Sequence, residues 1–362
     1  MKIITVLGAR PQFIKASVVS RAFEQLAGIE EIIVHTGQHF DANMSDVFFS
    51  ELGIRTPRYQ LDIHGGGHGE MTGRMLAEVE KVLLSEKPDA VLVYGDTNST
   101  LAGALAAAKL HIPVAHVEAG LRSFNMAMPE EINRILTDRI SDWLFTPTRA
   151  ADDHLKHEGT PSEKILRVGD VMYDVALHFG RMAADENALA AFGLRAGDYV
   201  LTTVHRAENT DDPLRLKAIM EAFATVARSR PIIWPMHPRT RAILKKLGLD
   251  EASTANLKLV DPVGYLDMVR LEKYAGIIAT DSGGVQKEAF FHKVPCVTLR
   301  DETEWTELVE AGWNRLVPPT DAAKISTAIL EAFGKSGADA TPYGSGDAAV
   351  RIAERLHRDL SA

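Results

Sequence analysis

The sequence predicts an α/β protein made of two doubly wound domains in tandem. Short β-branched runs alternate with longer amphipathic stretches along the chain, a pattern typical of parallel sheets covered by helices. At 362 residues the chain is too long for one compact core and suits two domains. The alternation pauses near residues 168–174. We therefore predict an N-terminal domain over residues 1–172 and a C-terminal domain over residues 173–346.

The predicted elements follow in order. The first half offers strands at Ile3–Leu7, Glu31–Thr36, Ala90–Tyr94, Val114–Val117 and Trp143–Phe145, and helices such as Ala102–Leu110 and Glu130–Ile140. An alanine-rich segment, Arg181–Phe192, reads as helical. The second half offers strands at Tyr199–Val204, Ile232–Pro235, Leu257–Val260, Gly276–Ala279, Val294–Leu299 and Arg315–Val317, and Asp347–Leu360 predicts a last amphipathic helix. Since ligands bind beyond the carboxyl ends of such strands, we expect the site in the cleft between the domains.

Composition narrows the function classes. A formal net charge of −9 argues against a nucleic-acid partner, which needs a basic face. No apolar run reaches membrane-spanning length, and no Cys/His spacing resembles a zinc site, so we expect neither a membrane partner nor a metal. The chain begins directly with a strand, without a signal-peptide pattern, so we expect a cytoplasmic protein. The single cysteine, Cys296, lies in an apolar run and is interpreted as a core thiol.

The turn Asp281-Ser-Gly-Gly284 follows an apolar strand and opens a helical pattern. Either of its first two residues can cap the helix, and its two glycines leave the first N–H groups uncovered. Such amides at the positive end of a helix dipole bind phosphate, although capped turns also occur without a ligand in every α/β protein. Gln286 and Glu288 lie within the next turn, close enough to reach a group attached to that phosphate.

A second turn, Gly8–Lys15, follows the first strand. Gly8 permits close approach of a ligand, and Arg10 and Lys15 place two cations near a helix start. A cation opposes the dipole there, which suggests that an anion binds, unless these are ordinary surface charges. The turn lacks the G-x-G-x-x-G spacing of dinucleotide sites, so we expect no nicotinamide cofactor.

Carboxylates follow two further strands. Asp96 lies at the carboxyl end of a strand, and the two residues after it are better placed to cap the next helix. Glu118 ends an apolar strand, where a charge is costly unless it is paired, with Arg122 as one possible partner, or used in chemistry. Glu130 and Glu131 begin a helix, where the dipole alone explains acidic residues.

His205 and Arg206 end the first strand of the second half, where they are either structural or able to contact a diphosphate opposite Arg10. Cations together with a phosphate-binding turn predict a diphosphate ligand such as a sugar nucleotide. Carboxylates at the other end of the site predict proton transfer to or from the sugar.

Motifs in register along the whole chain resemble the non-hydrolysing UDP-N-acetylglucosamine 2-epimerase family. They are Gly8–Pro11, Gly95–Thr97, His116–Arg122, Pro129–Glu131, His205–Arg206, Thr280–Gly284 and Thr303–Glu304. Three further segments are similar to the branch that acts on UDP-2,3-diacetamido-2,3-dideoxy-glucuronic acid: Ile33–Ser45, Leu61–Gly66 and Met71–Leu76. That branch makes a mannuronic acid derivative for surface polysaccharide such as lipopolysaccharide O-antigen.

The resemblance implies a GT-B type fold of two Rossmann-like domains, with the helix in residues 347–362 returning to the first and UDP bound by the second. It also implies a homodimer without a cofactor. A base removes the sugar carbon-2 proton while UDP leaves carbon-1, giving a glycal, and UDP re-adds after a proton reaches the opposite face.

The resemblance also implies residue roles. Arg10 and His205 stabilise the departing diphosphate. Asp96, Glu118 and Glu130 handle the protons, with the two faces unassigned, and Lys15 orients or tunes them. The remaining UDP-sugar contacts are Ser282, Gly283 and Gly284 at the phosphates, Glu288 at the ribose, Met268 at the uracil, and Val263.

The chain departs from the family pattern in several places. Met268 stands where many members have Phe, and Trp305 replaces an arginine. The segment after Gln38-His39 lacks the pattern of members activated by their own substrate, which argues against such allostery. A uronate substrate needs an extra cation, for which the candidates are Arg122, Arg134 and Arg300.

Three alternatives remain open. The nearest is the parent activity, conversion of UDP-N-acetylglucosamine to UDP-N-acetylmannosamine. A GT-B glycosyltransferase shares the fold and nucleotide site but needs an acceptor groove, and clustered acids at sugar carbon-2 serve it poorly. A sugar-nucleotide-binding regulator would bind its ligand without needing Asp96.

Overall fold

Two parallel sheets organise the chain. The computed structural model describes residues 1–38, 49, 53–249 and 256–361. The chain divides into unit 1, which comprises Met1–Val175 and Thr341–Ala362, and unit 2, which comprises Ala176–Ala340. The boundaries expected from the sequence were residues 172 and 346. The chain re-enters unit 1 ahead of the last helix because the Tyr343 carbonyl already accepts a hydrogen bond from the Asp170 N–H of unit 1, at 3.0 Å.

Unit 1 contains a seven-stranded parallel sheet in the order β3-β2-β1-β4-β5-β6-β7. Its strands are β1 (Lys2–Leu7), β2 (Glu30–His35), β3 (Tyr59–Gln60), β4 (Ala90–Tyr94), β5 (Val114–Val117), β6 (Trp143–Thr146) and β7 (Ile165–Arg167). The central strands are buried on both faces, as expected for a sheet covered by helices on each side. The sequence did not predict β3 and β7, because two or three residues at a sheet edge carry no readable periodicity.

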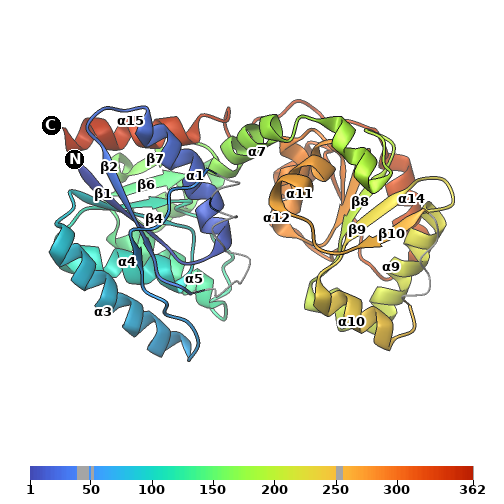
Figure 1. The fold of residues 1–362 in the computed structure, drawn as a ribbon, viewed down its shortest axis with the longest axis horizontal. Coiled ribbons are helices and arrows are strands. Elements are labelled where there is room, and N and C mark those ends of the chain that lie inside the picture. The colour runs from blue at the N-terminus through green and yellow to red at the C-terminus, as the bar shows by residue number, and fades with distance from the viewer. Residues whose placement is uncertain (39–48, 50–52, 250–255, 362) are drawn as a thin grey trace. The chain divides into compact units, whose positions relative to one another are not determined.

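The helices of unit 1 are α1 (Arg10–Glu24), α3 (His68–Glu86), α4 (Asn98–Lys109), α5 (Pro129–Ile140), α6 (Arg149–His157), α7 (Val171–Met182), which continues into unit 2, and α15 (Ala348–Leu360). The helix α15 lies beside α1 although the two are at opposite ends of the chain (Figure 1). Asp174 on α7 accepts the N–H groups of Ala348 and Ala349 at 3.2 and 2.9 Å. This carboxylate therefore caps the returning helix.

Unit 2 contains a six-stranded parallel sheet in the order β10-β9-β8-β11-β12-β13. Its strands are β8 (Val200–Thr203), β9 (Ile232–Pro235), β10 (Leu257–Val260), β11 (Ile277–Thr280), β12 (Cys296–Thr298) and β13 (Asn314–Leu316). Its helices are α8 (Ala207–Thr210), α9 (Pro213–Val226), α10 (Pro238–Lys246), α11 (Tyr265–Lys273), α12 (Gly283–Phe291), α13 (Thr306–Glu310) and α14 (Ala322–Ala332).

The predicted strands are confirmed, with ends that shift by a residue or two. The helix predicted over Arg181–Phe192 is wrong: α7 ends at Met182, and Glu186–Phe192 forms a 3-10 helix. Asp185 starts this short helix by accepting the Asn187 N–H, and Gly193 ends it in a left-handed conformation. The segment between these start and stop residues is short and forms a 3-10 helix instead of a regular α-helix.

Candidate active site

The order of strands reverses between β1 and β4 in unit 1 and between β8 and β11 in unit 2. At such a point the loops after neighbouring strands diverge, which opens a binding crevice beyond their carboxyl ends. The predicted site residues follow these strands: Arg10 and Lys15 after β1, Asp96 after β4, Glu118 after β5, His205 after β8 and Ser282 after β11.

Gln12 joins the two loops at the reversal in unit 1. Its carbonyl oxygen accepts the N–H groups of Gly8 and Ala9 at 2.8 and 3.1 Å, and its amide donates to the Tyr94 carbonyl at 2.7 Å. A Cβ on Gly8 would lie 1.9 Å from the Ser99 Oγ. The expectation that Gly8 makes room for a ligand is therefore corrected, because this glycine makes room for the helix after β4.

Lys15 of α1 and Glu118, which follows β5, form an ion pair. Burial lowers the pKa of Lys15, but the charge of Glu118 outweighs it, and the pKa is raised above its ordinary value. Glu118 is 7% exposed and adopts a left-handed backbone conformation, with φ of 71°. The suggested pairing of Glu118 with Arg122 is wrong, because Arg122 is bound to Asp138 and Glu158 instead.

Asp96 is paired with Arg134 of α5. The guanidinium Nη2 and Nε lie 2.6 and 3.0 Å from one oxygen of Asp96, and Nη1 lies 2.7 Å from Glu131. Thr97 caps α4, as the sequence suggested, which leaves the Asp96 carboxylate one third exposed at 32%. Glu130 is exposed in the first turn of α5.

Glu131 has a structural role beyond the helix dipole. Its carboxylate is buried and accepts the N–H groups of Ser123 and Phe124 at 2.7 to 3.0 Å. Burial raises the pKa of Glu131, but these N–H donors and Arg134 outweigh it, so the pKa is lowered. The dipole explanation offered by the sequence was incomplete, because the loop before α5 folds back so that its N–H groups also bind this carboxylate.

The arginines proposed as partners of a uronate are all engaged with carboxylates of the chain. Arg122 has a 1% exposed side chain between Asp138 and Glu158. Arg300 is 6% exposed and binds both oxygens of Glu304 at 2.8 and 3.0 Å. Arg134 is the most exposed of the three at 15%, and it holds Asp96.

In unit 2, Ser282 caps α12, accepting the Val285 N–H at 3.5 Å. The other candidate cap, Asp281, has a different function. It is fully buried and accepts the N–H groups of His205 and Arg206 at 3.0 to 3.1 Å, which fixes the loop after β8 against the loop after β11. Sequence reasoning did not find this function, because no local pattern shows that a buried carboxylate is bonded 75 residues away.

Gln286 does not face a ligand. It is fully buried, accepts a hydrogen bond from Thr303 at 2.6 Å and from Asn314 at 3.0 Å, and donates to Ser282 O at 3.3 Å. The expectation that Gln286 reaches a ligand is therefore corrected: its side chain holds α12 to the segments after β12.

The other predicted contacts of unit 2 surround the start of α12 and the loop before α11. His205 is half exposed, with Nδ1 3.5 Å from the Asp281 carboxylate. Glu288 turns back toward the helix start, since its Oε2 lies 4.0 Å from the place a Cβ on Gly284 would take. Val263 and Met268 are partly buried against the core of unit 2. Trp305 donates to the Gly283 carbonyl at 2.9 Å.

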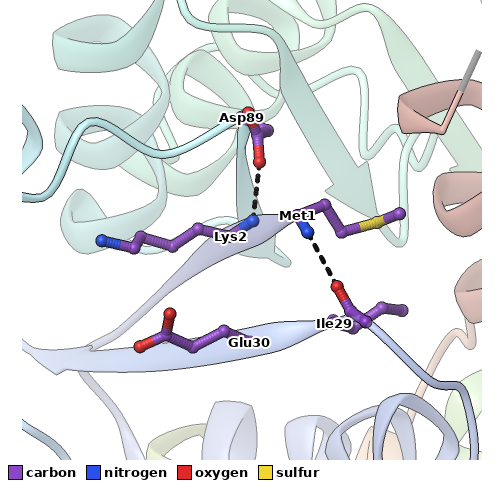
Figure 2. Close-up of a pocket in the computed structure, with 6 residues that line it drawn as sticks. Met1, Lys2, Ile29, Glu30 and Asp89 are labelled. Atoms are coloured by element: carbon purple, nitrogen blue, oxygen red, sulfur yellow. Dashed lines mark hydrogen bonds between the residues drawn. The ribbon is translucent and has the colours of Figure 1, made fainter.

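A hollow in unit 1 lies at the opposite ends of the strands, their amino ends (Figure 2). Its volume is about 490 Å³, and its lining residues precede or begin strands β1, β2 and β4, among them Met1, Glu30 and Asp89. None of the predicted site residues lines it. The candidate active site is therefore defined by the carboxyl ends of the strands.

Among the residues that the structure describes, no group of three or more His, Cys, Asp or Glu side chains is arranged to hold a metal ion. No helix in these parts of the chain has the length and hydropathy to cross a membrane. The part of the branch-specific motif from His39 to Ser45, where the chain departs from the regulatory pattern, lies outside the described residues.

Comparison with known proteins gives one consistent result. UDP-2,3-diacetamido-2,3-dideoxy-D-glucuronate 2-epimerase of Pseudomonas aeruginosa is 58% identical over 360 residues, covering 98% of this chain and 99% of that protein. The structure of UDP-GlcNAc 2-epimerase from Methanocaldococcus jannaschii matches with a TM-score of 0.89 at 46% identity, covering 99% of this chain and all of that one. A structure of the Methanocaldococcus jannaschii enzyme in complex with UDP-GlcNAc and UDP matches with a TM-score of 0.84 at 48% identity, covering 99% and 100%.

These matches confirm the predicted fold class, two Rossmann-like domains of GT-B type. A sequence model described as UDP-N-acetylglucosamine 2-epimerase matches residues 21–357. The chain belongs to the UDP-N-acetylglucosamine 2-epimerase family.

Proposed function

We propose that this protein is a UDP-sugar 2-epimerase that converts UDP-2,3-diacetamido-2,3-dideoxy-glucuronic acid to its mannuronic acid epimer. The main support for this proposal is a pair of carboxylates that follow neighbouring strands, each paired with a cation: Asp96 with Arg134 and Glu118 with Lys15. Inversion at carbon-2 needs proton removal on one face and delivery on the other, so it needs two such groups. The identity to the Pseudomonas aeruginosa 2-epimerase supports the choice of substrate.

In the proposed reaction, one carboxylate removes the carbon-2 proton while the carbon-1 to oxygen bond breaks, and the electron pair leaves with UDP. The glycal then takes a proton on the opposite face, and UDP re-adds at carbon-1. Asp96, Glu118 and Glu130 are the proton-handling groups, with the faces unassigned. The Lys15 ammonium group pairs with Glu118 and orients its carboxylate.

The departing diphosphate needs fixed positive groups, since carbon-2 is only weakly acidic. We propose that Arg10 and His205 supply them, together with Ser282 and the amides of Gly283 and Gly284 at the start of α12. Glu288 then accepts the ribose hydroxyls, and Val263 and Met268 lie against the uracil.

The test is solvent exchange at carbon-2. Purified protein is incubated with the uronate nucleotide in D₂O, and the carbon-2 signal is followed by proton NMR without any sugar acceptor. Deuterium incorporation with epimer formation is expected for the wild type. Asp96→Asn and Glu118→Gln are each expected to lower the exchange rate by about 10²- to 10⁴-fold.

Asp142→Asn is the matched control. Asp142 is an exposed carboxylate of unit 1 that binds the Val114 N–H at the amino end of β5, away from the site. Its loss is expected to leave exchange unchanged. Transfer of the sugar to an acceptor without exchange at carbon-2 would instead identify a glycosyltransferase, and UDP-sugar binding without either reaction would identify a regulator.

One observation favours a second substrate, UDP-N-acetylglucosamine. Arg122, Arg134 and Arg300, the candidate partners of a uronate carboxylate, are each bound to carboxylates of the chain. A neutral sugar would not need to displace any of them. A comparison of kcat/KM for the two nucleotide sugars decides which one is the substrate. An equal or higher kcat/KM for the neutral sugar would reject the uronate assignment.

We also propose that the protein forms a homodimer and serves surface polysaccharide synthesis, such as that of lipopolysaccharide O-antigen, in the cytoplasm. Light scattering at micromolar protein concentration measures the oligomeric state. A mass near twice the 39.6 kDa of the chain is expected, whereas the mass of one chain would reject it.

A further inference from the structure

His116 and Asp138 form a buried pair in unit 1 that the proposed reaction does not use. His116 is the third residue of β5, and Asp138 lies in the last turn of α5. The imidazole Nδ1 is 2.7 Å from the Asp138 Oδ1, and the two side chains are 0% and 2% exposed. A buried ion pair is weak support for stability by itself, so its place in the fold needs another explanation.

Both ring nitrogens of His116 face oxygen atoms. Nδ1 faces the Asp138 carboxylate, and Nε2 lies 2.8 Å from the Gly95 carbonyl oxygen. Burial raises the pKa of Asp138, but His116 and Arg122 outweigh it, so the pKa is lowered. Since a carbonyl oxygen can only accept, Nε2 donates the hydrogen bond to Gly95, and the ring links this carbonyl to the Asp138 carboxylate.

The bond to Gly95 fixes the turn that carries Asp96. Gly95 has φ of 64°, and its N–H donates to the Val117 carbonyl at 3.0 Å. Its own carbonyl, which belongs to the peptide bond with Asp96, is the acceptor for His116. The backbone that places the Asp96 carboxylate is thus held at both the N–H and the C=O of the residue before it.

The other oxygen of Asp138 fixes the turn that carries Glu118. Oδ2 accepts the Gly120 N–H at 3.1 Å and binds Arg122 at 2.7 Å. Glu118 and Gly120 have φ of 71° and 79°. A left-handed conformation at a residue other than glycine is strained and persists only where surrounding bonds hold it. Two of these bonds end on the Phe145 carbonyl, which accepts the N–H groups of Glu118 and Ala119 at 3.1 Å each.

We infer that His116 and Asp138 are positioning residues of the epimerisation. Their buried pair fixes both acid-bearing turns and so sets the separation and direction of the Asp96 and Glu118 carboxylates. This inference rests on the proposed function. The two carboxylates serve opposite faces of one carbon atom, so their relative placement matters more than the placement of either alone. A displacement of about 1 Å is enough to lower the rate about 10²-fold.

The test uses four variants of the full-length protein: His116→Ala, His116→Gln, His116→Asn and Asp138→Asn. Glutamine keeps a donor near the place of Nε2, and asparagine keeps one near the place of Nδ1. His116→Ala and Asp138→Asn are expected to lower kcat about 10- to 100-fold, with KM and the Kd for UDP within about twofold of wild type. His116→Gln, which retains the donor to Gly95, is expected to recover part of the lost kcat, and His116→Asn is not.

Asp152→Asn is the matched control. Asp152 is also a buried acid of unit 1, and among the described residues its carboxylate binds Thr146 at 2.5 Å and Arg167 at 3.6 Å but forms no hydrogen bond with either acid-bearing turn. The thermal stability of Asp152→Asn is expected to fall like that of Asp138→Asn, while the kcat of Asp152→Asn stays at the wild-type value. If His116→Ala does not fold, the comparison of the glutamine and asparagine variants decides in its place.

Two results would overturn the inference. One is a wild-type kcat in His116→Ala or in Asp138→Asn. The other is a loss of kcat that follows thermal stability alone, so that the Asp152→Asn control loses as much, or so that asparagine at position 116 recovers as much as glutamine. Failure of the proposed function is a different outcome, since the wild type itself would then show no exchange at carbon-2.

Discussion

Single residues in this protein act through what lies next to them in space. Gly8 is the plainest case, because the sequence suggested a glycine that admits a ligand, and the structure shows one that admits the Ser99 hydroxyl. The carboxylates follow the same rule. Asp281 and Asp96 each follow a strand end, yet one is fully buried in a loop junction and the other is partly exposed beside Arg134.

Replacing Gly8 by alanine tests the packing of the loop after β1. The added Cβ would lie 1.9 Å from the Ser99 Oγ and 2.5 Å from the Thr36 Oγ1, so the helix after β4 must shift. We expect the free energy of unfolding to fall by about 1–3 kcal/mol, measured by urea denaturation. Gly73→Ala is the control, because a Cβ at this exposed position of α3 meets nothing within 4 Å. It is expected to stabilise by about 0.5–1 kcal/mol, and an equal loss in both variants would contradict the packing argument.

Helices such as α4 and α12 are capped by their own N-cap residues, whereas α15 takes its cap from elsewhere in the chain. The returning helix α15 has no side-chain cap from its own N-cap residue, Asp347, and takes Asp174 of α7 instead. Burial raises the pKa of Asp174 to about 6, against the stabilising N–H groups of Ala349 and Ala348. This cap therefore titrates within a pH range where the protein can be studied.

The sign of the pH effect follows from that shift. A carboxyl whose pKa is higher in the folded state binds its proton more tightly there, so its contribution to stability is complete below about pH 4 and is lost as pH rises through about 6. Compared with Asp174→Asn, the wild type is expected to lose on the order of 2 kcal/mol between pH 4 and pH 7. Thermal unfolding of both proteins across this range measures the difference. A difference that stays constant, or that grows with pH, would contradict the assigned shift.

The whole molecule divides its proposed work between two sheets. The acids and their cations belong to unit 1, and helix α12, which begins with Gly283 and Gly284, belongs to unit 2. The proposed function therefore makes nucleotide binding and proton transfer separable by mutation. Each unit keeps its own switch point between neighbouring strands, so a change in one need not disturb the other.

Gly284→Val tests this division. A Cβ at Gly284 would meet the Ser282 Oγ at 3.9 Å and the Glu288 Oε2 at 4.0 Å, so a side chain fits without displacing its neighbours. It would cover the amides at the start of α12, and the Kd for UDP is expected to rise at least about 10-fold by calorimetry. Asp96→Asn in unit 1 is the counterpart and is expected to leave that Kd unchanged. Equal effects of the two variants on UDP binding would reject the division.

The sequence alone determined the fold class, most strand positions and the turns that end them, because these depend on local periodicity and on Gly, Pro and capping residues. Its motifs also determined the family. Only the tertiary structure decided which partner each charge takes: Lys15 rather than Arg122 for Glu118, Arg134 for Asp96, and the His116–Asp138 pair behind both turns. These partners lie far apart in the chain, and charge pairing depends on distances in space that no local pattern encodes.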